Sequence, residues 1–183
     1  LHKRIALGIV SKVGKKPTTL ILGFIIAVGF VSMWMSNTTA TVMMLPVALA
    51  ISSTLGDNAA GLKKAMVLAI PYAATIGGMA TVIGTTTNPT GIGLIRETIG
   101  IDIDFLDWMK IGLPFTVILI PFFWLYMVKF FKVDKMPPTD ISIARRQYEE
   151  LGPMNKGEKW VAAIFVLCVI LWVTRSLVWG DWF

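Results

Sequence analysis

One uncharged stretch of the chain carries residue types that could bind an ion or a small anion. Residues 32–41 read Ser-Met-Trp-Met-Ser-Asn-Thr-Thr-Ala-Thr, and they lie in the middle of a run, 17–56, that contains no charged residue. Bilayer hydrocarbon offers no water to hydroxyl and amide groups, so these groups need internal partners or a ligand. Neutral oxygens suit a sodium ion, and N–H and O–H donors suit a carboxylate. This polar cluster is therefore a candidate binding site.

A second uncharged run, 65–95, has 31 residues, which is too many for one straight spanning helix and too few for two. It contains Gly77-Gly78, then Gly84 followed by three threonines, and then Asn88-Pro89. Glycine and proline interrupt the helical hydrogen-bond ladder, and broken transmembrane helices line ion and substrate sites in transporters. A helix-packing face would explain Gly77 and Gly78 equally well, but it does not require the polar residues of 84–89. We therefore expect a broken helix here.

Composition places the chain in a membrane. Of its 183 residues 55% are hydrophobic and only 15% are charged, and the mean hydropathy is +0.71. The net charge of +6 does not indicate nucleic-acid binding, because the basic residues flank apolar segments instead of forming a stripe with aromatics. The lone Cys168 excludes an internal disulfide and carries no metal-site signature. The chain has no initiator methionine, and we expect it to be part of a longer protein.

The first long apolar run must fold back on itself. Residues 1–14 have the pattern of an amphipathic helix with Ile5, Ile9 and Val13 on one face, which predicts a helix lying in the membrane interface. The following 40 uncharged residues are twice the length of one span, and lysines flank both ends. Two geometries remain open: a full two-helix hairpin with its polar tip at the far surface, or a re-entrant hairpin with its tip inside the membrane.

The rest of the chain predicts two further spans. An acidic link, 96–110, leads to a spanning helix at 111–128, with Pro114 in its first turn and Pro121 at a kink. Residues 132–159 are polar and predict an extramembrane loop. A last span over 160–179 has Trp160 and Trp179 as interfacial anchors.

The basic residues predict the orientation of these segments. Fourteen Lys and Arg residues lie in 1–16, 57–64 and 129–159, and only three lie elsewhere. By the positive-inside rule these three segments are cytoplasmic, and the protein is a multi-pass protein of the cytoplasmic membrane.

Three motifs in order resemble the divalent-anion:sodium symporter family, whose members take up di- and tricarboxylates or sulfate. The first is Ser32, Ser36, Asn37 and Thr38; the second runs from Ile76-Gly77-Gly78 through Thr81 to Gly84-Thr85 and Asn88; the third is Asp104-Phe105-x-x-Trp108 leading into Gly112-Leu113-Pro114. The resemblance covers essentially the whole chain.

The resemblance implies an all-α integral membrane fold, built in the family from two inverted repeats that each contain a re-entrant hairpin and a broken transmembrane helix. Only part of that fold is expected here, because a second Ser-Asn-Thr is missing. The implied segments are an interfacial helix (1–16), a re-entrant hairpin (17–56), a broken helix and the following span of the transport domain (57–131), a cytoplasmic loop (132–159), and the first helix of the second repeat, which belongs to the scaffold (160–183).

The same resemblance implies the roles of particular residues. A sodium ion would take oxygens from Ser32, Ser36 and Asn37 on the hairpin and from the segment around the break, where the residues are Gly84, Thr85 and Asn88. Asn37 and Thr38 would donate hydrogen bonds to one carboxylate of the substrate. One departure concerns the break: the family usually has proline before its asparagine, whereas here Pro89 follows Asn88.

The implied function is sodium-coupled uptake of a small divalent anion of the succinate, malate or fumarate type, with citrate and sulfate as further candidates. A homodimer is expected for the full-length protein. The alternatives are a sodium-independent anion exchanger of the same fold and a channel-like subunit built on the same hairpin. An enzyme is not expected, because the apolar segments hold no constellation of His, Asp, Glu and Cys, and the only histidine, His2, lies in the interfacial helix.

Overall fold

Helices make up every regular element of the part of the chain that the structure describes. The structure is a computed structural model, and it describes residues 2–12, 16–53, 55, 59–135 and 142–174. The helices are α1 (His2–Ser11), α2 (Pro17–Ser32), α3 (Asn37–Ser52), α4 (Ala60–Gly78), α5 (Thr87–Ile99), α6 (Phe105–Phe130), the short 3-10 helix η2 (Val133–Lys135), α7 (Ser142–Glu150) and α8 (Lys156–Thr174).

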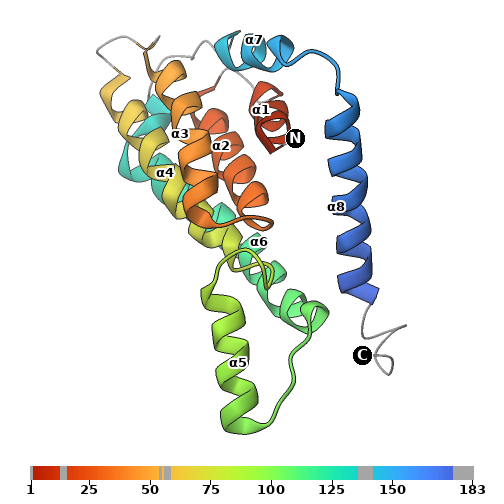
Figure 1. The fold of residues 1–183 in the computed structure, drawn as a ribbon. Helices are drawn as coiled ribbons and strands as arrows, with labels where there is room; N and C mark the ends of the chain where they lie inside the picture. The colour runs from red at the N-terminus through yellow and green to blue at the C-terminus, as the bar shows by residue number, and fades with distance from the viewer. Residues whose placement is uncertain (1, 13–15, 54, 56–58, 136–141, 175–183) are drawn as a thin grey trace.

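Helices α2 and α3 form a hairpin with the polar cluster at its tip. Each helix has 16 residues, and residues 33–36 connect them. At about 1.5 Å per residue each helix is about 24 Å long, which is shorter than the ~30 Å hydrocarbon core of a bilayer. In Figure 1 the tip lies about halfway along the path that α4 and α5 follow together. This length and position favour the re-entrant geometry, which stays a prediction.

The predicted broken helix is confirmed. Helix α4 ends at Gly78, residues 79–86 are non-helical, and α5 begins at Thr87. Pro89 is the third residue of α5, where its missing N–H removes no helical hydrogen bond, so its place after Asn88 is compatible with the start of the second half-helix. One boundary differs from our expectation: α4 begins at Ala60, so Lys63 and Lys64 lie in its first turns and not in a separate link.

The core is the packing of α4 against the hairpin. Gly77 of α4 contacts Gly29 of α2 so closely that a Cβ on Gly77 would lie 2.5 Å from the Gly29 Cα. This approach requires glycine at position 77, whereas a Cβ on Gly29 would make ordinary contacts, the nearest 3.6 Å from the Ala73 carbonyl oxygen. The core that these helices share contains fully buried apolar residues, among them Phe24, Ile25, Met44, Met66 and Ile70.

Helix α6 begins earlier than the hydropathy predicts. The Asp104 carboxylate accepts a hydrogen bond of 2.7 Å from the Asp107 N–H, which is an N-cap, and the helix therefore starts at Phe105 and runs for 26 residues. Our placement of Pro114 in the first turn was consequently wrong, because both Pro114 and Pro121 lie inside this helix. Helix α6 and α8 are the two described helices that are long and apolar enough to cross a membrane.

Helix α1 buries a different face from the one that its sequence suggested. Ala6, Leu7 and Val10 are fully buried against the core, whereas Ile5 and Ile9 are half-buried. The reason is that α1 has neighbours on two sides: α2 on one and α7 on the other. We also expected Val13 on the apolar face of the first helix and Trp179 as an interfacial anchor. Both residues lie outside the described part of the chain.

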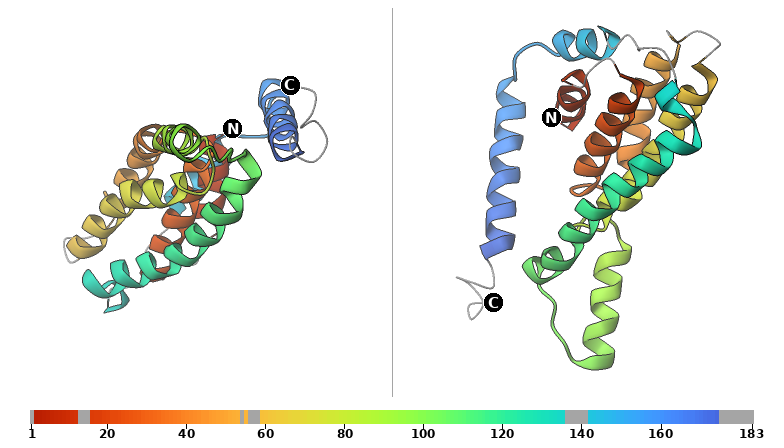
Figure 2. Two further views of the ribbon diagram at one scale, coloured as in Figure 1. Left: turned by 90° about the horizontal axis from the view of Figure 1, so that it is seen from below. Right: turned by 180° about the vertical axis from the view of Figure 1, so that it is seen from behind.

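The segment 132–159, expected to be a loop, contains helix α7, which packs on α1. Figure 1 shows α1, α7, the open end of the hairpin, the start of α4 and the end of α6 at one end of the molecule, and the turn between α5 and α6 at the other. This arrangement agrees with the predicted grouping of the basic segments on one side. Figure 2 shows α8 beside α1, with α4 on the opposite side of the bundle.

Candidate ion and anion site

The tip of the hairpin is organised by its own polar side chains. Ser32, the last residue of α2, is fully buried, and its hydroxyl donates a hydrogen bond of 2.8 Å to Asn37 Oδ1 at the start of α3. Ser36 is the N-cap of α3: its Oγ accepts from the Thr39 N–H at 3.3 Å and lies 2.7 Å from Thr39 Oγ1. The chain can therefore turn sharply between two apolar helices because local hydroxyls and one amide satisfy the turn.

The hairpin tip and the helix break are in direct contact. Asn37 Oδ1 lies against Gly78, the last residue of α4, so closely that a Cβ at position 78 would collide with it. The same Cβ would lie 3.2 Å from the Gly84 carbonyl oxygen, which places the oxygens of Asn37 and Gly84 around one glycine. The Thr81 hydroxyl, which is fully buried, also donates a hydrogen bond to the Met33 carbonyl at the end of α2.

Asn88 holds the break in shape. This side chain is buried, and its Nδ2 donates hydrogen bonds to two carbonyls, that of Gly78 at 2.8 Å and that of Thr81 at 2.7 Å. Carbonyls at the end of a helix have no partner within the helix, and here the first residues of the next half-helix provide one. Asn88 thus connects the end of α4 to the start of α5.

Helix α6 supports the break from the other side. Trp108 Nε1 donates a hydrogen bond of 3.0 Å to the Met79 carbonyl, and Thr116 Oγ1 donates one of 3.0 Å to the Ile76 carbonyl. Gly112 lies between these two residues on α6, and a Cβ there would be 3.1 Å from the Ala80 carbonyl oxygen. Carbonyls of the interrupted helix are in this way bound by side chains of α6, which helps to order the break.

Four helix ends of opposite polarity meet at this place. Helices α2 and α4 present their carboxyl ends, and α3 and α5 present their amino ends. Carboxyl ends of helices carry partial negative charge and favour a cation, whereas amino ends carry partial positive charge and favour an anion. One contact region therefore offers carbonyl oxygens to a cation and N–H groups to a carboxylate.

The predicted site residues fall into two groups in the structure. It brings Ser32, Asn37, Gly84 and Asn88 together around Gly78, as the hypothesis of a shared site requires. The other three predicted residues are more open: the side chains of Ser36 and Thr38 are exposed, and Thr85 is half-buried with its carbonyl accepting from the Asn88 N–H at 3.2 Å.

Our sequence reasoning assigned no role to Thr81 or Thr116 and placed Trp108 at a membrane interface, although all three bond to the tip or to the break. A signal was present for Thr81 and Thr116, because each is a lone hydroxyl within an apolar stretch and such a group needs a partner. For Trp108 no signal distinguished this role from that of an interfacial anchor.

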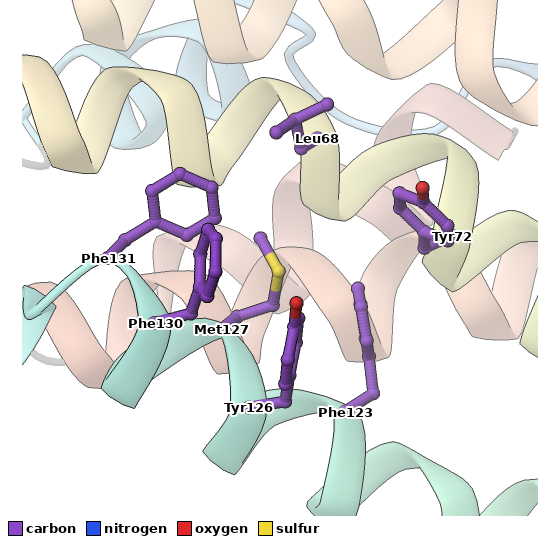
Figure 3. Close-up of a pocket in the computed structure, with 7 residues that line it drawn as sticks. All are labelled: Leu68, Tyr72, Phe123, Tyr126, Met127, Phe130 and Phe131. Carbon is purple, nitrogen blue, oxygen red and sulfur yellow. The ribbon is translucent and has the colours of Figure 1, made fainter.

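A separate cavity of about 320 Å³ lies between α4 and α6 and does not compete for this role. Figure 3 shows that its walls are aromatic and aliphatic side chains, with two tyrosine hydroxyls as the polar groups; the residues are Leu68, Tyr72, Phe123, Tyr126, Met127, Phe130 and Phe131. Such a lining does not offer the oxygens that a hard cation needs. The described residues also contain no group of three His, Cys, Asp or Glu side chains placed to hold a metal ion.

Replacing Asn88 with alanine is expected to destabilise the protein by about 2 kcal/mol, because two carbonyls of the break lose their donor in a buried place. The measurement is thermal unfolding of the purified full-length protein in detergent. Thr90→Ala is the matched control, since the exposed Thr90 hydroxyl donates to the carbonyl of Thr86, the residue just before the same helix, at 2.9 Å. Equal melting temperatures for the two variants would contradict the role assigned to Asn88.

The chain is similar in sequence to known membrane transporters. The family model described as "Sodium:sulfate symporter transmembrane region" matches residues 1–179. The chain is 37% identical to proteins named "Sodium-dependent dicarboxylate transporter SdcS" from Staphylococcus aureus strains USA300 and COL. The alignments cover 100% of this chain and 37% of each relative, so the chain spans little more than a third of their length. The chain therefore belongs to the sodium:sulfate symporter family of membrane transporters.

Proposed function

We propose that the protein of which this chain is a part takes up dicarboxylate-type divalent anions across the cytoplasmic membrane, coupled to sodium. The observation that carries the proposal is the contact of Asn37 at the hairpin tip with Gly78 and Gly84 at the helix break. The family description and the name of the Staphylococcus aureus relatives support sodium as the coupling ion and a dicarboxylate or sulfate as the substrate. Neither name refers to an enzymatic reaction.

The proposed sodium site lies where the carboxyl ends of α2 and α4 meet. The Ser32 hydroxyl, the Asn37 side-chain oxygen and the Gly84 carbonyl are the oxygens that the structure already brings together. The remaining proposed ligands are Ser36, Thr85 and Asn88. Sodium is a hard cation that binds oxygen, and every one of these residues offers a neutral oxygen. Because none of these ligands is a carboxylate, the site with sodium bound has a net positive charge.

The positive charge of the bound sodium ion favours binding of a negatively charged substrate nearby. We place one carboxylate of the anion at the amino end of α3, where Asn37 and Thr38 supply side-chain donors and the helix supplies backbone N–H groups. The exposed Thr38 side chain is open to such a ligand. Asn37 then belongs to both sites, so that sodium on one side of this residue favours a carboxylate on the other.

Coupling follows from the shared residue. If the anion binds the sodium-loaded protein much more tightly than the empty one, sodium binding and substrate binding reinforce each other by the same factor. Movement of the loaded hairpin and broken helix relative to the scaffold would then expose the site on the other side of the membrane. The scaffold would include α8, the full-length protein would be a homodimer, and the segments 1–16, 57–64 and 129–159 would be cytoplasmic.

The test is uptake of radiolabelled succinate by the full-length protein in proteoliposomes. We expect uptake to follow an inward sodium gradient and to fall to the protein-free level when choline replaces sodium on both sides. Competition by unlabelled malate, fumarate, citrate and sulfate ranks the substrates. Uptake that continues in choline and requires a counter-anion inside would identify an exchanger, and a non-saturating conductance would identify a channel; either result would reject symport.

A further inference from the structure

The chain turns from α7 into α8 at a corner near α1 (Figure 1). Arg4 of α1 binds to this corner. Its guanidinium forms an ion pair with Glu158, with Nη2 3.1 Å from Oε2 and Nε 3.4 Å from Oε1. The same group donates to the Leu151 carbonyl at 3.0 Å and to the Gly152 carbonyl. One side chain thus contacts both the residues that directly follow α7 and the first turn of α8.

The Arg4 contacts complete the end of α7. This helix ends at Glu150, and the chain leaves it through Gly152, whose φ of 58° suits a residue without a side chain. The Leu151 and Gly152 carbonyls lie just beyond the last turn, where carbonyls have no partner within the helix. A basic side chain is the favourable partner at the carboxyl end of a helix.

Glu158 completes the start of α8. The Glu158 N–H donates to Asn155 Oδ1 at 2.7 Å, and the Asn155 N–H donates to Glu158 Oε2 at 3.1 Å. This reciprocal pair is a capping box, which fixes the direction in which a helix begins. The carboxylate that directs α8 is therefore also the carboxylate that binds Arg4.

Helix α1 packs both on the hairpin and on α7. Leu7 and Val10 of α1 are fully buried in the core that includes the hairpin helices. On another face of α1, Gly8 lies against α7, with its Cβ position 3.2 Å from Tyr148 Cε2. Helix α1 therefore lies between the hairpin and the corner, and Arg4 is its polar connection to the corner.

We propose that Arg4 is a positioning residue for transport: together with Glu158 it clamps the α7–α8 corner onto α1 and so fixes the joint about which the hairpin moves relative to α8. This inference rests on the proposed function, because it assigns the clamp to the movement between hairpin and scaffold. The clamp contacts neither the proposed ion site nor the proposed anion site. It acts on the rate at which the loaded protein changes conformation, and not on substrate affinity.

A second ion pair of the same type provides the control. Arg145 and Glu149 on α7 form a pair of 3.2 Å, but their side chains are 73% and 64% exposed, against 12% and 20% for Arg4 and Glu158. Exposed pairs contribute little because water and salt screen them, whereas the two-pronged pair of Arg4 and Glu158 is part-buried and is screened less. Lysine cannot reproduce the planar fork of arginine.

The experiment measures succinate uptake by the full-length protein in proteoliposomes at equal amounts of incorporated protein. For Arg4→Ala we expect the maximal rate to fall about tenfold with the apparent KM within about twofold of the wild type, a loss of conformational rate and not of binding. The maximal rate of Arg4→Lys is expected to lie between those of Arg4→Ala and the wild type. Glu158→Gln, which preserves the capping hydrogen bonds, is expected to resemble Arg4→Ala, and Arg145→Ala is expected to resemble the wild type.

Wild-type rates for both Arg4→Lys and Glu158→Gln would overturn the clamp, as would an equal loss in Arg145→Ala. If the wild type itself takes up no succinate, the proposed function fails, and the clamp is then tested by melting temperatures. In that measurement Arg4→Ala, Glu158→Gln and the double variant form a double-mutant cycle. A double variant no less stable than the worse single variant supports the clamp, and additive losses reject it.

Discussion

Alanine at position 37 is expected to abolish sodium-driven succinate uptake, lowering it at least about 100-fold. Asn37 bonds to the end of α2, contacts the break at Gly78 and lies at the amino end of α3. Its removal takes one oxygen from the proposed sodium site and one donor from the proposed anion site. The measurement is uptake by the full-length protein in proteoliposomes, with sodium titrated at fixed succinate.

Two further variants make this expectation specific. Asn37→Asp keeps the oxygen that accepts from Ser32 but adds a negative charge, so we expect sodium binding to persist while succinate affinity falls. Ser53→Ala is the matched control, because Ser53 is an exposed hydroxyl residue at the opposite end of the same helix, where its Oγ donates to the Ala50 carbonyl at 2.8 Å. Uptake by Asn37→Ala at more than half the wild-type rate would reject the assignment of this residue to the site.

Adding a single methyl group at Gly77 is expected to cost the protein about 3 kcal/mol or more of its stability. The Cβ of Gly77→Ala would collide with the Gly29 backbone, and backbone atoms cannot rotate aside as the end of a side chain can. Helices α2 and α4 must then separate along the contact that holds the hairpin against the broken helix. We expect a large fall in melting temperature, measured on the full-length protein in detergent, and loss of uptake.

The same substitution elsewhere in the chain should have the opposite sign. At Gly91 and Gly93 of α5 a Cβ would meet no atom within 4 Å. Alanine is a better helix former than glycine by about 1 kcal/mol, so Gly91→Ala and Gly93→Ala are expected to leave the stability of the protein unchanged or to raise it. A Gly77→Ala variant as stable as these two would show that the close approach of α2 and α4 does not determine the fold.

Several features were predictable because they depend on residues that are near one another in the chain. An apolar run of 40 residues between lysines must reverse direction, and Gly, Thr and Pro in the second run must interrupt a helix. The helix boundaries were less predictable. Helix α6 starts at its Asp104 cap and not at the first strongly apolar residue, since a capping hydrogen bond satisfies the helix end more effectively than hydropathy indicates.

The site was predictable in its residues but not in its arrangement. Ser32 and Asn37 are close in sequence, and their hydrogen bond follows from a short turn between two helices. The resemblance to the symporter family implies that Ser36 is a ligand. In the structure its hydroxyl caps α3, because the first turn of a helix needs an acceptor for its free N–H groups. Its role as a sodium ligand stays a prediction.

The amino-acid sequence by itself determined that this is a membrane protein, where its helix is broken, and which polar residues stand inside apolar segments. These conclusions need only composition and local spacing. Only the tertiary structure decided that Gly77 meets Gly29, that Asn37 meets Gly78, and that Arg4 meets Glu158, 154 positions away. The physical reason is that helical periodicity identifies a face but not its partner: which faces meet depends on how closely two backbones can approach, and on which distant donor reaches each carbonyl left free at a helix end.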